Sequence, residues 1–509
     1  MRERYALWEP SMSSIKKLAG QTAVYGVSTI VGRLINFALV PLFSYIFGQP
    51  QDLGLNTEFF AYVAFLNVVF TFGMETALFN FLSNESDKSM VYSTALRTIL
   101  VSTVVLTIPF IVLAQPIANL IRYPDHPDFI VWAILIVTID TLTALPFAKL
   151  REENKAKRFA AIKMLSILVN VFVTIFFVVV CKYYHDKNAS SFLGSLYSPS
   201  VGIGYAFIAN LAASGVSLLF LVKDYSKIRY GFDPALLKRM LRYSLPLLIV
   251  GFAGMINEVF DKILLKYLLP AGIGEAQVGI YGACAKIAIL MTIFWQAFRY
   301  AAEPFFFSRN KEEQSRGIYA TVMTYFIVFC LAIFLGTTMN ISWIQYMIGP
   351  KYRSGLPVVP VLLVANMCLG IYFNLSIWFK LTGRTQFGMW LTIIGAIVTL
   401  VLNFIWIPME GYFGGYMGAA WATLICYALM MVMSYFMGQK YFPVPYNIPK
   451  ALGYLALGIG LYFAGHYTDT GSWVADLVFR NLIFLLFLVV VVLVEKPFRF
   501  IRNRQKKSQ

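Results

Sequence analysis

Charged side chains inside long apolar stretches are the residues of this sequence best suited to chemistry. A charge at the centre of a bilayer costs about 2.5–3.5 kcal/mol on insertion scales, so it normally faces a partner or a water-filled cavity. The candidate site residues are five bases, Arg33, Arg97, Lys262, Lys286 and Arg299, and three acids, Asp140, Glu258 and Asp261. We predict that these side chains face a polar path through the protein or pair with one another.

The five bases have the chemistry of an anion site. Convergent lysine and arginine donors recognise phosphate and pyrophosphate, most strongly where water is scarce. Arg33 and Lys286 have no acidic residue within one helical turn on their own segment, so each needs another helix, water or a ligand as its partner. We therefore predict that at least two of these bases contact a phosphorylated substrate.

The three acids allow two interpretations, and the sequence does not choose between them. Asp140, Glu258 and Asp261 are either structural counter-ions of the bases or sites for a coupling proton or sodium ion. Glu258 and Lys262 are four residues apart and share a helical face, which favours simple neutralisation. Lys266 lies near the outer end of the same apolar segment, where we expect its ammonium group to snorkel toward the interface.

Other site chemistries find no support in the sequence. The five cysteines are scattered through apolar stretches without a C-x-x-C spacing, and the three histidines are far apart, so no zinc site is expected. The nucleotide-binding pattern G-x-x-x-x-G-K-[ST] does not occur, which argues against ATP hydrolysis by this chain. We expect no cofactor other than a coupling sodium ion or proton.

The segments that position these residues are long and apolar. The chain of 509 residues is 59% hydrophobic and only 13% charged, with a mean hydropathy of +0.69. A bilayer core needs roughly 20 apolar helical residues to span it, so we predict an all-α polytopic membrane protein with about 14 transmembrane helices. The predicted spans are 18–47, 57–82, 92–120, 128–148, 159–181, 197–222, 241–269, 277–308, 317–347, 356–379, 386–408, 416–437, 450–467 and 474–494.

The positive charge of the chain follows the loops. The formal net charge is +17, and most lysines and arginines fall in alternate connectors, as the positive-inside rule predicts for cytoplasmic loops. The loops assigned to the outside carry few bases, namely Arg122, Lys182, Lys187, Lys351 and Arg353. This pattern predicts that both termini are cytoplasmic, and it explains the net charge without nucleic-acid binding.

The sequence also indicates an internal repeat. A shift of 225 residues places Gly26 on Gly251, Gly54 on Gly279 and Ala77 on Ala302. Six crossings separate the copies, so the repeats would be parallel, with a substrate site expected between them. The predicted organisation is a cytoplasmic segment (1–17), a six-helix lobe (18–222), a cytoplasmic linker (223–240), a second six-helix lobe (241–437), helices 13 and 14 (450–494) and a basic cytoplasmic tail (495–509).

Two stretches resemble a known family. The first contains FDKILLKYLLP, VGIYGACAKIAIL and QAFRYAAEPFFF between residues 260 and 307, and the second contains LTGRT, IIGAIVTLVLNFIWIP and GYMGAAWATL between residues 381 and 424. Both are similar to the polysaccharide flippases of the multidrug, oligosaccharidyl-lipid and polysaccharide (MOP) exporter superfamily. The resemblance extends to the number and order of the spans, and by position Arg33, Lys262, Lys286 and Arg299 match the places where that family carries cavity cations.

The resemblance implies a function in transport rather than catalysis. It implies export of a polyprenyl-pyrophosphate-linked oligosaccharide by alternating access across a bacterial cytoplasmic membrane, for surface polysaccharide or lipopolysaccharide biosynthesis. The partners implied are the lipid-linked sugar, membrane lipids, and glycosyltransferases or a polymerase of the same pathway. Three alternatives stay open: a flippase for the lipid-linked peptidoglycan precursor, an ion-coupled multidrug exporter and, least favoured, a membrane glycosyltransferase or ligase.

Overall fold

The computed structural model describes residues 30–32, 34–35, 37–39, 41–308 and 315–495. Within these ranges every regular element is a helix and no strand occurs. Twelve helices are long and apolar enough to cross a membrane. Two more occupy predicted spans: a shorter apolar helix over Ile30–Ile46, and α11 (Pro234–Leu268), a 35-residue helix that carries several charges. The predicted all-α polytopic fold is confirmed.

The helices fall into two compact units, residues 1–279 and 280–509. Besides α11, the described elements of the first unit are α2 (Pro50–Thr71), α3 (Met74–Asn84), α4 (Lys88–Val112), α5 (Ala114–Leu120), α6 (Pro127–Glu152), α7 (Ala156–Ile175), a π-helix (Phe176–Cys181), α8 (Lys182–Lys187), α9 (Phe192–Ser195), a 3-10 turn (Gly202–Gly204), α10 (Tyr205–Leu221) and a 3-10 segment (Val222–Tyr230).

Helix α12 (Ile273–Ser308) begins in the first unit and continues into the second. The other elements of the second unit are α13 (Ser315–Met339), α14 (Ile341–Ile344), 3-10 turns (Gln345–Met347 and Pro350–Gly355), α15 (Val358–Leu375), α16 (Ile377–Leu381), α17 (Gln386–Trp406), α18 (Gly415–Tyr441), α19 (Ile448–His466) and α20 (Trp473–Glu495).

Helix ends in the first unit are set by local residue choices. The carboxylate of Asp233 accepts hydrogen bonds from the backbone N–H groups of Ala235 and Leu236 at 2.8 and 3.1 Å, and Pro234 occupies the first turn of α11, where its missing N–H costs nothing. Between α2 and α3, Phe72 and Gly73 adopt left-handed backbone conformations with φ of 33° and 72°. The break divides one long membrane-crossing segment into two helices.

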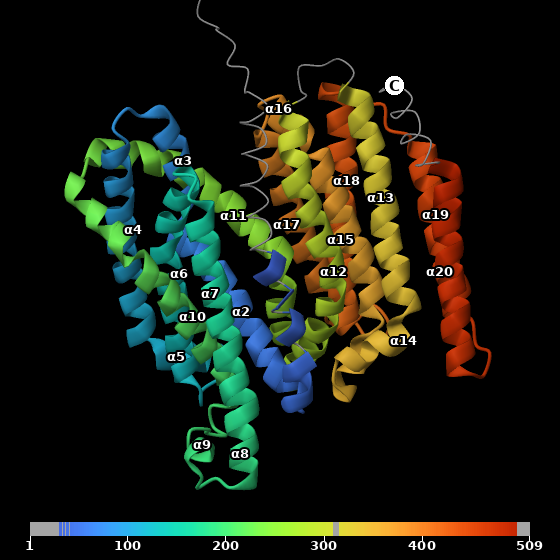
Figure 1. Ribbon diagram of the computed structural model, residues 1–509, viewed down its shortest axis with the longest axis horizontal. Coiled ribbons are helices and arrows are strands. Elements are labelled where there is room, and N and C mark those ends of the chain that lie inside the picture. The colour runs from blue at the N-terminus through green and yellow to red at the C-terminus, as the bar shows by residue number, and fades with distance from the viewer. Residues whose placement is uncertain (1–29, 33, 36, 40, 309–314, 496–509) are drawn as a thin grey trace, which may run out of the picture. The chain divides into compact units, whose positions relative to one another are not determined.

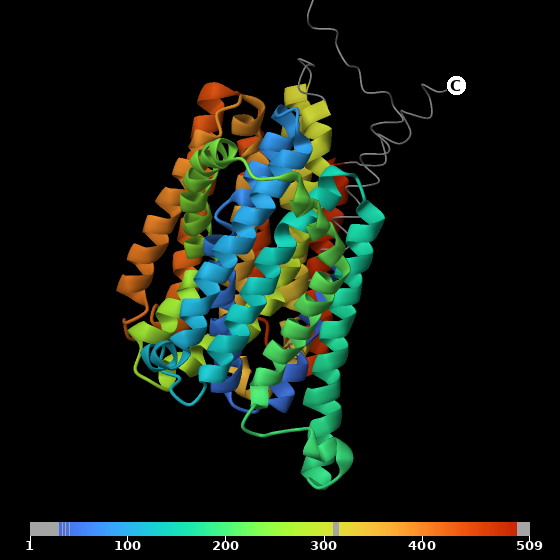
Figure 2. The same ribbon diagram turned by 90° about the vertical axis from the view of Figure 1, so that its left-hand side faces the viewer.

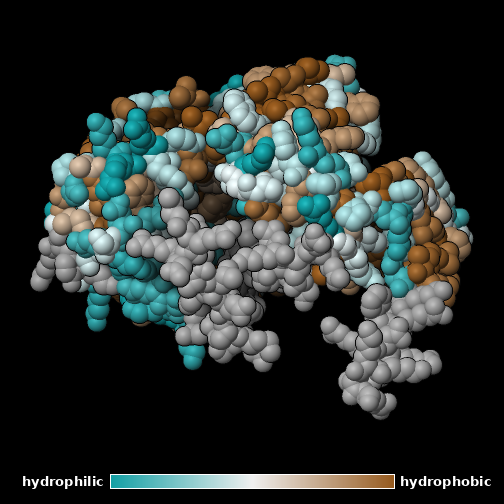
Figure 3. Space-filling model, turned by 90° about the horizontal axis from the view of Figure 1, so that it is seen from above, coloured by the Kyte–Doolittle hydropathy of each residue, from teal (hydrophilic) through white to brown (hydrophobic). Residues whose placement is uncertain are grey.

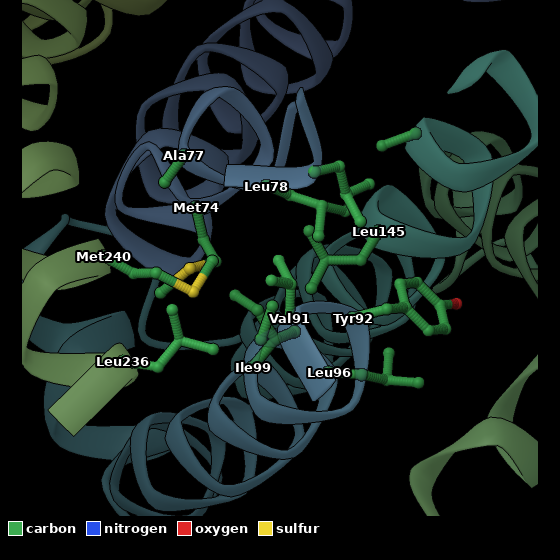
Figure 4. Close-up of a cluster of buried hydrophobic side chains, with 13 residues drawn as sticks. Met74, Ala77, Leu78, Val91, Tyr92, Leu96, Ile99, Leu145, Leu236 and Met240 are labelled. Carbon is green, nitrogen blue, oxygen red and sulfur yellow. The ribbon is translucent and has the colours of Figure 1, made fainter. Parts of the chain in front are cut away.

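A buried apolar cluster holds α11 within the first unit. Figure 4 shows Met74 and Leu78 of α3, Val91 of α4, Leu145 of α6 and Met240 of α11 pointing into one core. Their side chains are almost completely buried, and α11 also packs against α2 and α4. The first turns of α11 are therefore packed against helices that precede it in the chain.

One helix of the first unit extends well past the length of a membrane crossing. The segment Ala156–Lys187, which joins α7, the π-helix and α8, is continuous over 32 residues. At 1.5 Å per residue it is about 48 Å long, against a hydrocarbon core of about 30 Å. Figures 1 and 2 show α8 and α9 projecting at the end of this helix.

The last two helices form an apolar flank of the second unit. Helices α19 and α20 pack against each other and against α13. Figure 3 shows apolar side chains in brown at the right, the side on which Figure 1 shows α19 and α20. The large side chains Val478, Leu482 and Leu485 of α20 are exposed. Asn340, which follows α13, and Asn481 of α20 exchange side-chain amide hydrogen bonds of 3.2 and 3.0 Å. The exposed apolar face is suited to lipid, and the amide pair fixes α20 to α13.

Candidate functional site

The described candidate residues are distributed over both units. Arg97 lies on α4, Asp140 on α6, and Glu258, Asp261 and Lys262 on α11, all in the first unit, whereas Lys286 and Arg299 lie on α12 in the second. Arg33 lies outside the described residues. The structure thus brings together the three candidates of α11, and it shows the surroundings of Asp140 and Arg299 in detail.

Lys262 is held by its own helix. Its ammonium group lies 2.8 Å from Oδ1 of Asp261 and donates a 3.1 Å hydrogen bond to the backbone carbonyl of Glu258. Asp261 is buried, whereas the residue Glu258 is exposed. Lys262 therefore contacts Glu258 through the main chain, and the carboxylate beside its ammonium group is that of Asp261.

Asp140 has a small polar environment in the first unit. The Ser214 hydroxyl of α10 donates a 2.7 Å hydrogen bond to Oδ1 of Asp140, and the positive charge of Lys163 on α7 also acts on this carboxylate. Asp140 therefore joins three helices. This arrangement suits a structural counter-ion of Lys163 as well as a proton site.

Arg97 and Lys286 are half-buried and each interacts with other residues. Arg97 is on α4, and Lys286 is on the part of α12 that belongs to the second unit. Their role in anion binding stays a prediction.

Arg299 lines a small pocket of the second unit. Its guanidinium carbon lies 5.7 Å from the ring centroid of Trp295 and 5.3 Å from that of Phe373, and these two rings stack with their centroids 4.6 Å apart. The pocket is also lined by Gly370 and Asn374 of α15, and its volume of about 10 Å³ is close to the least that a water molecule needs. Aromatic faces beside a guanidinium group stabilise its charge.

Two buried donors accompany this pocket. Nε1 of Trp295 and Nδ2 of Asn374 are buried and have no hydrogen-bond partner among the described residues. A buried donor without a partner costs about 1–3 kcal/mol. The pocket therefore contains polar groups that the described part of the protein leaves unsatisfied.

Lys266 and Glu58 are the most completely buried charged residues in the described part of the chain, and the snorkelling expected of Lys266 is wrong. Lys266 does not snorkel: its side chain is 0% exposed, and that of Glu58 on α2 is 1% exposed. The ammonium nitrogen lies 3.0 and 3.1 Å from the two carboxylate oxygens of Glu58 and donates a 2.6 Å hydrogen bond to the carbonyl of Ile121. A lysine near the end of an apolar segment is here folded inward because a carboxylate from another helix receives it.

Three tyrosines complete this group. Tyr62 and Tyr123 donate their hydroxyl hydrogens to Glu58, Tyr123 at 2.8 Å, and the Tyr62 hydroxyl lies 3.0 Å from that of Tyr267. Lys266 also sits 3.5 Å from the ring centroid of Tyr123. Burial and the neighbouring carboxylate raise the pKa of the Tyr123 phenol, which lies in the α5–α6 loop, so it stays protonated and donates. We call Glu58, Tyr62, Tyr123, Lys266 and Tyr267 the Glu58 cluster.

Sequence reasoning overlooked Glu58, although signals were present. Glu58 falls inside a predicted span, and Tyr62 follows four residues later on the same helical face. The partner of this carboxylate lies 208 residues away in sequence, so no local spacing could identify it.

No group of three or more histidine, cysteine or acidic residues within the described ranges could hold a metal ion. The five cysteines are buried and unlinked. The site chemistry available in these ranges consists of charged, hydroxyl, amide and aromatic groups.

Comparisons with known proteins agree with this architecture. A family model described as "Polysaccharide biosynthesis protein" matches residues 18–308. No curated protein sequence matches the chain.

Solved structures share the fold at low sequence identity. The lipid II flippase MurJ in an inward closed conformation is similar with a TM-score of 0.70 and 16% identity, covering 92% of this chain and 99% of MurJ. An inward-facing multidrug resistance MATE transporter of the MOP superfamily has a TM-score of 0.61 and 16% identity, covering 80% of this chain and 94% of the transporter. A Vibrio cholerae MATE transporter mutant has a TM-score of 0.55 and 12% identity, covering 85% and 99%.

The family match covers more than half of the 509 residues, and both kinds of structural neighbour have the polytopic helical fold seen here. The chain is a multi-pass helical membrane protein, and it shares its fold with these neighbours. The chain belongs to the family described as "Polysaccharide biosynthesis protein".

Proposed function

We propose that this protein is a flippase that exports a polyprenyl-pyrophosphate-linked oligosaccharide from the inner to the outer leaflet of a bacterial cytoplasmic membrane, by alternating access, for surface polysaccharide or lipopolysaccharide biosynthesis. The observation that carries the proposal is the family match over residues 18–308. The fold shared with a lipid II flippase over 92% of the chain supports a lipid-linked substrate. The protein is not an enzyme in this proposal.

The basic residues of the spans supply the anion chemistry that such a substrate needs. Arg97, Lys262, Lys286 and Arg299 are half-buried groups on helices α4, α11 and α12, and together with Arg33 they are the proposed contacts of the pyrophosphate. A pyrophosphate leaving water requires cationic donors to replace its hydration. These side chains offer that replacement within the helical part of the molecule.

The acids keep two proposed roles. Asp261 lies 2.8 Å from the ammonium group of Lys262, which supports a counter-ion role. Asp140 and the exposed Glu258 are the better candidates for a coupling proton or sodium ion, because carboxylates in transporter helices commonly serve this purpose. No other cofactor is proposed.

The proposed setting follows from the loop charges. Both termini are cytoplasmic in the proposal, and the protein works with membrane lipids and with the glycosyltransferases or polymerase of the same pathway. A tag reachable only after permeabilisation at either end would support this orientation, and a tag reachable in intact cells would contradict it.

The direct test is lipid flipping by the purified protein in vesicles. A fluorescent polyprenyl-pyrophosphate oligosaccharide is placed in both leaflets, and a membrane-impermeant quencher reports how much substrate reaches the outer leaflet. The proposal expects flipping that an excess of unlabelled lipid-linked oligosaccharide suppresses. Vesicles with active reconstituted protein that flip no lipid-linked sugar would overturn it.

The same assay tests the second candidate, a flippase for the lipid-linked peptidoglycan precursor, which the MurJ likeness favours. Transport of lipid II in preference to the oligosaccharide would establish that function instead. Transport of a cationic drug in place of either lipid would favour the multidrug exporter that the MATE likeness suggests.

A further inference from the structure

The charged side chains of the Glu58 cluster are buried and have several hydrogen-bond partners. Both oxygens of Glu58 accept hydrogen bonds, one from Tyr62 and one from Tyr123, and both lie within 3.1 Å of the Lys266 ammonium group. Lys266 gains a carbonyl oxygen and an aromatic face besides. A buried ion pair is worth its desolvation only with geometry and extra hydrogen bonds of this kind.

The cluster ties together segments that are distant in sequence. Glu58 and Tyr62 come from α2, Tyr123 from the loop between α5 and α6, and Lys266 and Tyr267 from the last turn of α11. The other charged groups that act on it are Arg122, 5.2 Å from the ring centroid of Tyr267, and Glu275 in the first turn of α12. Separating α11 from α2 would break the Lys266–Glu58 ion pair and the Tyr62–Tyr267 contact, whereas the hydrogen bonds of Tyr62 and Tyr123 to Glu58 do not involve α11.

The start of α12 packs beside the cluster with almost no clearance. A Cβ atom on Gly274 would lie 2.6 Å from the carbonyl oxygen of Lys266. Gly54 and Gly279 meet in the same way: a Cβ on Gly54 would lie 2.1 Å from the Glu275 carbonyl oxygen, and one on Gly279 would lie 1.9 Å from that of Pro50. Helices α2 and α12 thus cross backbone to backbone one turn from Glu58.

The glycine contact is reciprocal in a specific sense. The shift of 225 residues that relates the sequence repeats carries Pro50 onto Glu275 and Gly54 onto Gly279. Gly54 approaches the carbonyl of Glu275, and its counterpart Gly279 approaches the carbonyl of Pro50, which is the counterpart of Glu275. The same close approach of a glycine to a carbonyl oxygen is thus made from both helices, as in a self-complementary contact.

An ion pair next to this helix crossing holds strongly while it is buried and weakly once water reaches it. While the cluster is dry, the two charges hold each other because no water competes for them. Once the helices part and water enters, each charge is hydrated and the separation costs little. An apolar contact of the same size would instead resist separation, since parting it exposes hydrocarbon to water.

We propose that the Glu58 cluster is a reversible latch at the external end of the protein, which holds α11 on α2 while that end is closed and opens when substrate leaves. This role rests on the proposed alternating-access function. In the predicted topology α2 begins, and α11 ends, on the external side, so opening this contact admits outside water.

The test measures access of outside water with a reporter thiol. Ala61 is 3% exposed and lies about one helical turn beyond Glu58 on α2, so we use Ala61→Cys and a membrane-impermeant maleimide applied to intact cells. In this background Glu58→Gln should speed labelling about tenfold, the effect of a one-decade shift toward the open state. Glu58→Met with Lys266→Met should slow labelling below that of the parent, because two apolar side chains favour the closed contact.

A matched control changes a similar pair in a different place. Lys88 and Glu152 are 2.9 Å apart, and the Lys88 side chain is 59% exposed, so Glu152→Gln should leave labelling unchanged. If Glu58→Gln fails to fold, Tyr267→Phe removes the 3.0 Å hydroxyl contact between α11 and Tyr62 of α2 and keeps the ring, and it should speed labelling by a smaller factor.

Opposite directions for the single and double variants would support the latch. Equal labelling in folded Glu58→Gln and parent proteins would overturn it, as would faster labelling in the double variant or labelling only from the cytoplasmic side. The assay contains no lipid-linked sugar, so the latch can fail while vesicle flipping succeeds, and flipping can fail while the latch is upheld.

Discussion

Polar groups are buried in two different ways in the two units. In the Glu58 cluster of the first unit, both carboxylate oxygens, the ammonium group and the neighbouring hydroxyls are engaged with one another. In the Arg299 pocket of the second unit, the Trp295 and Asn374 donors have no partner among the described residues. The first arrangement stabilises one conformation, whereas the second leaves donors that water or a ligand would satisfy.

The contrast separates two kinds of charge in a transporter helix. A charge whose surroundings complete its hydrogen bonds contributes to shape, and its removal is felt mainly as a loss of stability. A charge beside unsatisfied donors contributes little to shape, so its removal should be felt mainly in binding. Substitutions in the Glu58 cluster should therefore change mainly stability, whereas substitutions in the Arg299 pocket should change mainly binding.

The largest effect is expected when one half of the buried pair is removed. Lys266→Met leaves the Glu58 carboxylate buried without its counter-ion and should lower the free energy of unfolding by about 3–5 kcal/mol. Thermal unfolding of the detergent-solubilised protein measures the loss. Adding Glu58→Met should recover most of it, and a double variant as unstable as the single one would contradict the assignment.

The next effect concerns the crossing of α2 and α12. Gly279→Ala forces a methyl group onto the carbonyl oxygen of Pro50 and should destabilise the protein by about 1–3 kcal/mol. Gly254→Ala is the control, because open space surrounds that helical glycine and alanine favours a helix. Equal melting temperatures for the two variants would show that α2 and α12 are not in tight contact.

Removal of the Arg299 charge should affect transport more than stability. Arg299→Ala removes charge-assisted bonding of about 1.5–3 kcal/mol, which corresponds to a fall in vesicle flipping of roughly tenfold or more. Arg239→Ala is a control at an exposed ion pair with Glu85. A normal flipping rate in folded Arg299→Ala protein would remove this residue from the substrate path. Arg33→Ala and Lys262→Ala are tested in the same way against surface polysaccharide at matched protein abundance.

The smallest effect is expected from an unsatisfied donor. Asn374→Leu replaces a buried amide with an apolar side chain of similar size, so the free energy of unfolding should change by less than about 1 kcal/mol or rise slightly. A large loss of stability would show that the amide has a structural partner. The polar groups of the pocket would then be satisfied like those of the Glu58 cluster, and the proposed difference between the two regions would be wrong.

The sequence predicted the helices well because crossing a membrane leaves a strong local signal. Each predicted span from 57–82 onward overlaps a helix of the structure, including α11, which lies among the most charged helices. Hydrophobic length is a property of neighbouring residues and can be read without a fold. The break at Phe72 and Gly73 and the π-helix at Phe176–Cys181 were not predicted, because they depend on packing and backbone geometry.

The partners of the charges could not be predicted in the same way. The expectation for Lys266 assumed that the position of a lysine along its own segment determines the direction of its side chain. The side chain instead turns inward to Glu58 on another helix. Lys262 was expected opposite the Glu258 side chain by helical spacing, yet it reaches Asp261 and a carbonyl. Spacing gives the face of a helix, but ion pairing depends on which other helix that face meets.

The amide exchange between Asn340 and Asn481 has a mechanical consequence. Hydrocarbon offers no substitute for these hydrogen bonds, so sliding α20 along α13 would break both of them without replacement. Helices α19 and α20 should therefore move together with α13 during transport. A spin label on α20 should keep a constant distance from one on α13 in every transport state.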